Sequence, residues 1–238
     1  MKIYKKLVPD DTDFDTIDIS DIDDEFISKI RLTDAYAFLA FCKDTRHDEA
    51  RTRSRKVSTL RDFFKYCTVN KNIMKQNPMQ GLESPKIQKS LPKYLTLDQS
   101  LELLKNAATG PYKERDYAII TLFLNCGMRL SELCSLNYND IRDNNTITIT
   151  GKGNKQRTVY LNQACIDAVN EYMKVRPADG VKGDDRNALF LSARKQRISP
   201  KTVQHIVYQT LDKSGLSGQG YSVHKLRHTA ATLMYQNG

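Results

Sequence analysis

The sequence predicts a mainly α-helical protein with one small antiparallel sheet, an α+β fold class. Through most of the chain apolar side chains recur at helical spacing, which indicates amphipathic helices. Only residues 146–161 alternate β-forming residues on both sides of a glycine-containing turn, which predicts one hairpin. Ser84-Pro85 and Leu91-Pro92, with lysines between them, have the composition of an exposed linker and indicate two domains.

The first domain, residues 1–88, is expected to be all-helical. Its predicted helices cover residues 22–30, 33–43 and 48–70. Ser20 or Asp21 is the expected N-cap of the first helix. Five apolar residues of the third helix recur at helical spacing and are expected to face a core: Val57, Leu60, Phe63, Phe64 and Cys67. Asn77-Pro78 and Gly81 then interrupt the helical pattern.

Residues 89–93 are interpreted as the linker and residues 94–238 as the second domain. Thr96 is a good N-cap for its first helix, and Gly127 is expected to end the strongly apolar second helix. The predicted helices cover residues 96–108, 112–126, 130–136, 163–176 and 199–214, with a last one from about residue 222. The hairpin strands are expected at 146–150 and 156–161, and a short strand at 189–191.

Composition and charge narrow the class of protein. The chain has 238 residues and a net charge of +9; because residues 1–30 carry −5, the rest carries +14. No apolar stretch approaches the roughly 20 residues that span a bilayer, and the start lacks a signal-peptide pattern. Five cysteines without CxxC spacing favour reduced thiols in a cytoplasm over a zinc site or a disulfide framework. We therefore expect no membrane partner.

The positive charge is densest between Arg46 and Lys75, largely on the predicted helix 48–70. A basic helix beside a second basic region is the electrostatic signature of a nucleic-acid-binding protein, although a solvated charged face is the alternative for the helix alone. The second basic region is the hairpin, with Lys152 at its tip and Lys155 and Arg157 beyond it. An antiparallel ribbon of this kind could lie against a duplex.

Two helix starts combine charge with close spacing. Arg129 and Glu132 lie three residues apart and would share a helix face; an ordinary ion pair is the alternative. His224 and Arg227 have the same spacing in the first turn of the last helix, a position that favours phosphate; a structural histidine is the alternative. The sequence has no P-loop and no His/Asp/Glu cluster with metal-ligand spacing, so chemistry on a phosphodiester would rely on guanidiniums, a lysine and a histidine.

In this order, the segments RDYAIITLFLNCGMRLSEL, ITGKGNKQRTVYL and SVHKLRHTAATLMYQNG resemble the tyrosine recombinase (phage integrase) family, most closely its bacterial Xer-like members. The linker is similar too, and the resemblance covers roughly residues 48–238. It implies an N-terminal helical core-binding (SAM-like) domain, a catalytic domain, double-stranded DNA as partner, and no cofactor. It also implies a tetramer of recombinase subunits on two DNA sites.

The resemblance implies a role for each matching residue. Arg129 and Arg227 would hold the scissile phosphate, Glu132 would support the site, Lys152 would be the general acid, and His224 would complete the HxxR pair. The DNA contacts expected from the basic regions are Arg51, Arg53, Arg55, Lys56, Arg61, Lys155 and Arg157. Cleavage would pass through a 3′-phosphotyrosine.

The match ends before the family's nucleophile. Tyr235 is the only tyrosine after Arg227 and stands where the family has a packing position. We therefore expect a fragment that binds DNA, lacks its nucleophile and is incomplete at both ends. A non-catalytic DNA-binding protein derived from a recombinase and a type IB topoisomerase-like enzyme remain the alternatives.

Overall fold

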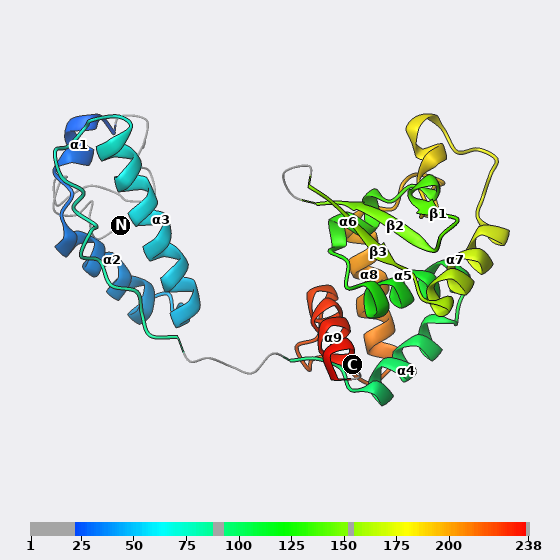
Figure 1. Cartoon of the computed structure of the whole chain (residues 1–238). Helices are drawn as coiled ribbons and strands as arrows, with labels where there is room; N and C mark the ends of the chain where they lie inside the picture. Colours follow the sequence, from blue (N-terminus) through cyan, green and yellow to red (C-terminus); the bar gives the residue numbers. More distant parts are fainter. Residues whose placement is uncertain (1–21, 88–92, 152–154, 237–238) are drawn as a thin grey trace. The chain divides into compact units, whose positions relative to one another are not determined.

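A computed structural model describes residues 22–87, 93–151 and 155–236 of the chain. The chain forms two compact units, Met1–Ser90 and Leu91–Gly238 (Figure 1). Within the described residues the architecture is mainly helical, with a small antiparallel sheet in the second unit, as the sequence predicts.

The first unit contains α1 (Asp24–Ser28), α2 (Leu32–Asp44) and α3 (Ala50–Val69). Its core is small and apolar, and consists of Ala35, Leu39, Val57, Phe64, Met79 and Leu82. The helix predicted over residues 22–30 is correct in place but too long, because the observed N-cap is Asp23, whose carboxylate accepts a hydrogen bond from the Phe26 amide. The expected caps Ser20 and Asp21 lie outside the described residues.

One core prediction for α3 is wrong. Phe63 is 45% exposed, whereas Phe64 is 2% exposed. The buried stripe of α3 runs through Val57, Phe64 and Cys67, and Phe63 lies at its edge, about 100° around the helix from Phe64. Its ring packs edge-on against Phe64, with 5.2 Å between the centroids, and so covers the core from outside.

The second unit is built around α5 (Lys113–Cys126), which is buried along most of its length. It contacts α4 (Leu97–Ala107), α7 (Gln163–Val175), α8 (Pro200–Lys213) and α9 (Val223–Gln236) (Figure 1). The short α6 (Leu130–Ser135) follows α5 and contacts α8. All six helix predictions in this unit are confirmed to within one or two residues.

The sheet has the order β1-β2-β3, with β1 at Ile141–Arg142, β2 at Thr146–Thr150 and β3 at Gln156–Tyr160. The predicted hairpin is confirmed, with Ile147 opposite Val159 and Ile149 opposite Arg157; its tip, residues 152–154, lies outside the described residues. The strand predicted at residues 189–191 is wrong. Leu191 makes an isolated bridge to Arg197, and Leu189 and Phe190 pack in the core. The prediction failed because a short buried apolar run also occurs outside sheets.

Two helix ends in the second unit are set by local sequence signals. Thr96 caps α4 through a reciprocal pair of hydrogen bonds with Gln99. Gly127 ends α5 in the left-handed region, with φ of 55°, and turns the chain into α6. Both expectations from the sequence are confirmed.

Replacing Gly127 by alanine should destabilise the second unit. A β-carbon there would meet the Ala230 Cβ at 3.5 Å, an ordinary contact, so the cost comes from the left-handed backbone and is about 1–2 kcal/mol. Gly127→Asn should cost less, because asparagine tolerates this region. Urea unfolding curves of both variants test this; equal stability of Gly127→Ala and the wild type would contradict it.

Candidate phosphate-binding site

The second unit contains a buried carboxylate surrounded by arginines. Glu132 lies on α6 and is 2% exposed. Its Oε1 accepts hydrogen bonds from Arg129 Nη1 and Arg157 Nη1, both at 2.8 Å, and its Oε2 accepts one from Arg157 Nη2 at 2.9 Å. The Arg129 backbone amide donates to Oε2 at 2.7 Å, and Arg227 Nη1 lies 4.0 Å from Oε2. We call these four side chains the arginine cluster.

Three separate elements supply the arginines. Arg129 is the N-cap of α6, and Glu132 closes the first turn back onto it. Arg157 lies on β3, and Arg227 lies in α9, where its Nη1 donates a hydrogen bond to the Gly127 carbonyl oxygen. The cluster therefore joins the α5–α6 turn, the hairpin and the last helix at one point.

The electrostatics of the cluster favour an anion. Burial alone would raise the pKa of Glu132, but the hydrogen bonds from Arg157 and from Arg129 outweigh it and hold the pKa at about 2. The carboxylate is thus ionised, and three guanidiniums against one carboxylate leave two net positive charges. Burial, followed by the neighbouring Arg129 charge, lowers the pKa of Arg227. An oxyanion that arrives at this point would relieve that repulsion.

The end of β2 next to the hairpin tip lies against the cluster. A β-carbon on Gly151 would stand 3.5 Å from Glu132 Oε1 and 3.9 Å from Arg129 Nη1, so the backbone at Gly151 lies beside both side chains. Lys152, the next residue, lies outside the described residues, and its predicted role remains a prediction. Lys155 is exposed on the other side of the turn.

His224 lies in the first turn of α9, three residues before Arg227. It lines a hollow together with Leu130, the residue after Arg129, and with Tyr208 of α8. Its Nε2 lies 3.1 Å from the Nε2 of His228. His228 is not among the residues predicted from the sequence, although the spacing of four residues on a helix could have suggested the contact.

The basic residues of α3 divide into two groups. Arg51, Arg55 and Arg61 are exposed, and Arg61 also donates a hydrogen bond to the Leu82 carbonyl oxygen. Arg53 and Lys56 are half-buried. Lys56 forms an ion pair with Asp48 at 2.5 Å and lies over the Phe38 ring, so it ties α3 to the segment before it.

Arg157 makes a contact that the sequence does not predict. The sequence predicts it among the DNA contacts of the hairpin, which stays a prediction, and in the structure both its terminal nitrogens hold Glu132. The sequence signal for this contact is the period-two alternation of β3. Alternate residues of a strand face opposite sides, so Arg157 faces the cluster while the next residue, Thr158, is exposed.

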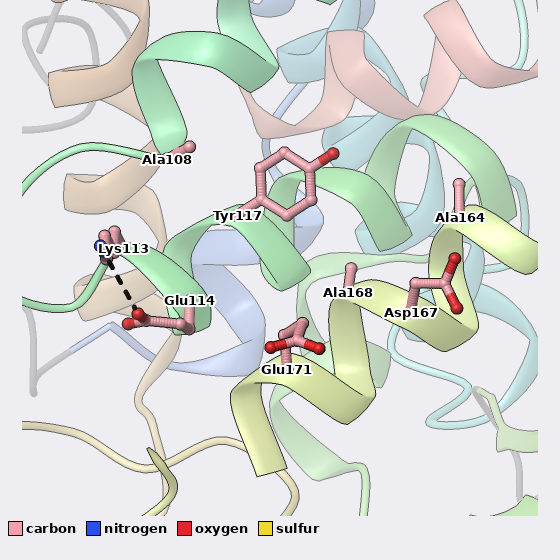
Figure 2. A pocket seen from close by; sticks show the side chains of 8 residues that line it. All are labelled: Ala108, Lys113, Glu114, Tyr117, Ala164, Asp167, Ala168 and Glu171. Atoms are coloured by element: carbon pink, nitrogen blue, oxygen red, sulfur yellow. Dashed lines mark ion pairs between the residues drawn. The ribbon is translucent and has the colours of Figure 1, made fainter. Parts of the chain in front are cut away.

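A hollow between α5 and α7 has the opposite charge (Figure 2). Tyr117 and three alanines form its apolar lining, and Glu114, Asp167 and Glu171 lie around it, with Lys113 paired to Glu114 at 3.9 Å. None of its lining residues belongs to the arginine cluster, and its carboxylates would repel a phosphate.

Two other kinds of site do not occur among the described residues. No three or more histidine, cysteine or acidic side chains gather as a metal site there. No helix in that part of the chain is long and apolar enough to cross a membrane.

The second unit is thus a mainly helical fold that gathers three guanidiniums around one buried carboxylate. Residues 93–238 match the model of the phage integrase family. The chain belongs to this family, that of the tyrosine recombinases, which confirms the resemblance seen in the sequence.

Relatives support the same assignment along the chain. It is 54% identical over all 238 residues to the tyrosine recombinase XerC of Caldanaerobacter subterraneus subsp. tengcongensis, and covers 66% of that protein. It is 37% identical over 190 residues to XerC of Psychromonas ingrahamii; the match takes in 79% of this chain and 62% of the relative. The chain thus spans somewhat less than two thirds of the length of these relatives.

Solved structures share the fold. A crystal structure of XerA recombinase is 26% identical, with a TM-score of 0.56 over 92% of this chain and 72% of that one. The Tn1549 transposon integrase in complex with circular intermediate DNA is 19% identical, with a TM-score of 0.74 over 100% of this chain and 87% of that one.

Glu132→Gln should change the acid sensitivity of the fold. Because the folded-state pKa of about 2 lies below the ordinary 4.5, ionised Glu132 stabilises the fold above pH 5, and this contribution is lost as the pH falls toward 2. It amounts to about 3 kcal/mol at most. Glu132→Gln should therefore be less stable at pH 7 and lose less stability between pH 5 and 2.

Urea unfolding at several pH values measures this difference. Glu171→Gln is the matched control, because Glu171 is exposed and pairs with its helix neighbour Lys174; its acid curve should follow the wild type. An unchanged acid curve for Glu132→Gln would contradict the assigned charge state.

Proposed function

We propose that the chain is the DNA-binding and phosphate-activating part of an Xer-like site-specific recombinase. The observation that carries this proposal is the arginine cluster, in which one buried carboxylate orients guanidiniums from three elements. The XerC relatives support it, because they match along the whole chain or most of it. Residues 1–88 would form the core-binding domain, 89–93 the linker and 94–238 the catalytic domain.

The cations of the site have different tasks in this proposal. Arg129, with a side chain 55% exposed, and Arg227 bind the non-bridging oxygens of the scissile phosphate and neutralise the charge of its five-coordinate transition state. Arg157 acts through Glu132 as a positioning residue. Lys152 protonates the departing 5′-oxygen, and His224 adds a further hydrogen bond to the phosphate.

Tyr235 does not serve as the nucleophile in this proposal. It follows Arg227 by eight residues on α9, which places it about 12 Å further along the helix axis. Tyr235 is 90% exposed, so its side chain is not packed against the arginine cluster. A tyrosine outside this chain would attack the phosphate and form the 3′-phosphotyrosine, so the chain alone should bind DNA without forming a covalent link.

The DNA contacts and partners follow from the same proposal. Arg51, Arg55 and Arg61 on the exposed side of α3, and Lys155 on the hairpin, would contact phosphates of double-stranded DNA. Arg53 and Lys56 would support that surface from within. The complete protein would act in the cytoplasm as a tetramer of recombinase subunits on two DNA sites.

In a longer protein that contains this chain and cleaves DNA, Arg129→Ala or Arg227→Ala should reduce the covalent DNA adduct about 100-fold or more, since each removes a transition-state charge partner. Binding to the same DNA should fall only a few-fold. Adducts resolved on denaturing gels, beside gel shifts, measure both quantities.

Tyr235→Phe is the control, and its adduct should form at the wild-type level. Loss of the adduct with Tyr235→Phe would make Tyr235 the nucleophile, and full cleavage by the arginine variants would overturn the role of the cluster. DNA binding without any adduct from the longer protein would favour the non-catalytic alternative. Relaxation of supercoiled plasmid without strand exchange would favour the topoisomerase-like one.

Arg51→Ala and Arg55→Ala together should weaken duplex DNA binding by this chain and flatten its salt dependence. Removing one phosphate interaction lowers the slope of log K against log salt by about 0.9. Gel-shift titrations at several salt concentrations measure this slope. Lys56→Ala is the control and should instead lower stability, because it breaks the ion pair with Asp48. An unchanged slope in the Arg51/Arg55 double variant would show that α3 is not part of the DNA-binding surface.

A further inference from the structure

Two imidazoles face each other on the first turns of α9. His224 and His228 are four residues apart, their rings are nearly perpendicular at 82°, and the centroids are 4.6 Å apart. The Nε2 atoms approach to 3.1 Å. At this separation one proton can lie between the two nitrogens, and a cation can replace it.

The separation of the nitrogens suits a metal ion. Zn–N bonds of about 2.0–2.1 Å place two cis nitrogens about 2.9 Å apart at 90° and about 3.3 Å apart at the tetrahedral angle. The observed 3.1 Å lies between these limits. Histidines at i and i+4 on one helix face are also the spacing by which helices bind zinc.

We propose that His224 and His228 form a chelating site for a borderline transition-metal ion, such as Zn²⁺ or Ni²⁺. His224 is exposed and His228 half-buried, so solvent reaches the pair and water would fill the other coordination positions. Imidazole nitrogen favours these ions over Mg²⁺ and Ca²⁺, which take oxygen ligands. The positive Lys225 and Arg227 nearby would weaken the site relative to one with a carboxylate ligand.

Metal at this pair would have a consequence for the phosphate site. The ion would occupy Nε2 of His224 and so remove that atom from a phosphate held by Arg227. This consequence rests on the proposed function, whereas metal binding itself does not, and a titration without DNA separates the two.

Zinc affinity of this chain, measured in competition with a chromophoric chelator, tests the site. We expect one zinc ion per chain, no competition by Mg²⁺, and at least about a tenfold loss of affinity in His228→Gln, which removes one of two protein ligands. His205→Gln is the matched control, because His205 is exposed on α8 and should leave the affinity within about twofold of the wild type.

A second measurement, on the wild-type chain, tests the site even if His228→Gln does not fold. In the wild-type chain, zinc should shift the ring nitrogen resonances of His224 and His228 and leave those of His47 and His205 in place. Absence of zinc binding would overturn the proposal. Wild-type affinity in His228→Gln, or shifts confined to other histidines, would do the same.

Discussion

The buried carboxylate of Glu132 is the interaction on which the rest of the second unit depends. An ionised carboxylate out of contact with water is strongly destabilising unless it is paired and hydrogen-bonded. Here the hydrogen-bond donors come from the start of α6 and from β3, and Arg227 of α9 adds a cation 4.0 Å from Oε2. Those elements are far apart in sequence, so satisfying one carboxylate fixes the relative positions of the helix start, the hairpin and the last helix. Gly127 is part of the same arrangement, because the left-handed α5–α6 turn offers its carbonyl to Arg227.

The pairing with Glu132 also explains why Arg157 and Arg129, with the same side-chain chemistry, differ in how far they are open to an anion. Arg157 gives both terminal nitrogens to Glu132, and its geometry is that of a bidentate clamp. Arg129 gives Glu132 one side-chain nitrogen and its backbone amide while more than half of its side chain stays exposed. A single carboxylate thus binds both terminal nitrogens of one guanidinium and orients a second guanidinium toward solvent. An anion site on a rigid scaffold requires such an orientation.

How much of this could be predicted from the sequence depends on whether the information is local. Thr96, Gly127 and the periodic apolar stripes act within one helix, and those predictions are confirmed. Arg129 with Glu132 is also a local pair, and their contact is observed.

The wrong predictions depend on information that lies elsewhere in the chain. Leu189 and Phe190 have a strand-like composition but pack in the core, and Phe63 belongs to a helix whose buried face is set by α2. The partner of Arg157 depends on the hairpin register opposite Ile149, which residue spacing alone does not reveal.

The charge of the cluster links its structure to its chemistry. Glu132 offsets one of three neighbouring guanidiniums, and the lowered pKa of Arg227 reflects, after burial, the repulsion from Arg129 that remains. If a phosphate binds here, as we propose, part of its binding free energy would be relief of repulsion already present in the folded chain. That gain would grow as negative charge accumulates on the phosphate oxygens, because the scaffold already holds the guanidiniums in place. In the proposed function, a carboxylate buried among three arginines would favour the more highly charged transition state over the ground state, which is the condition for catalysis by differential binding.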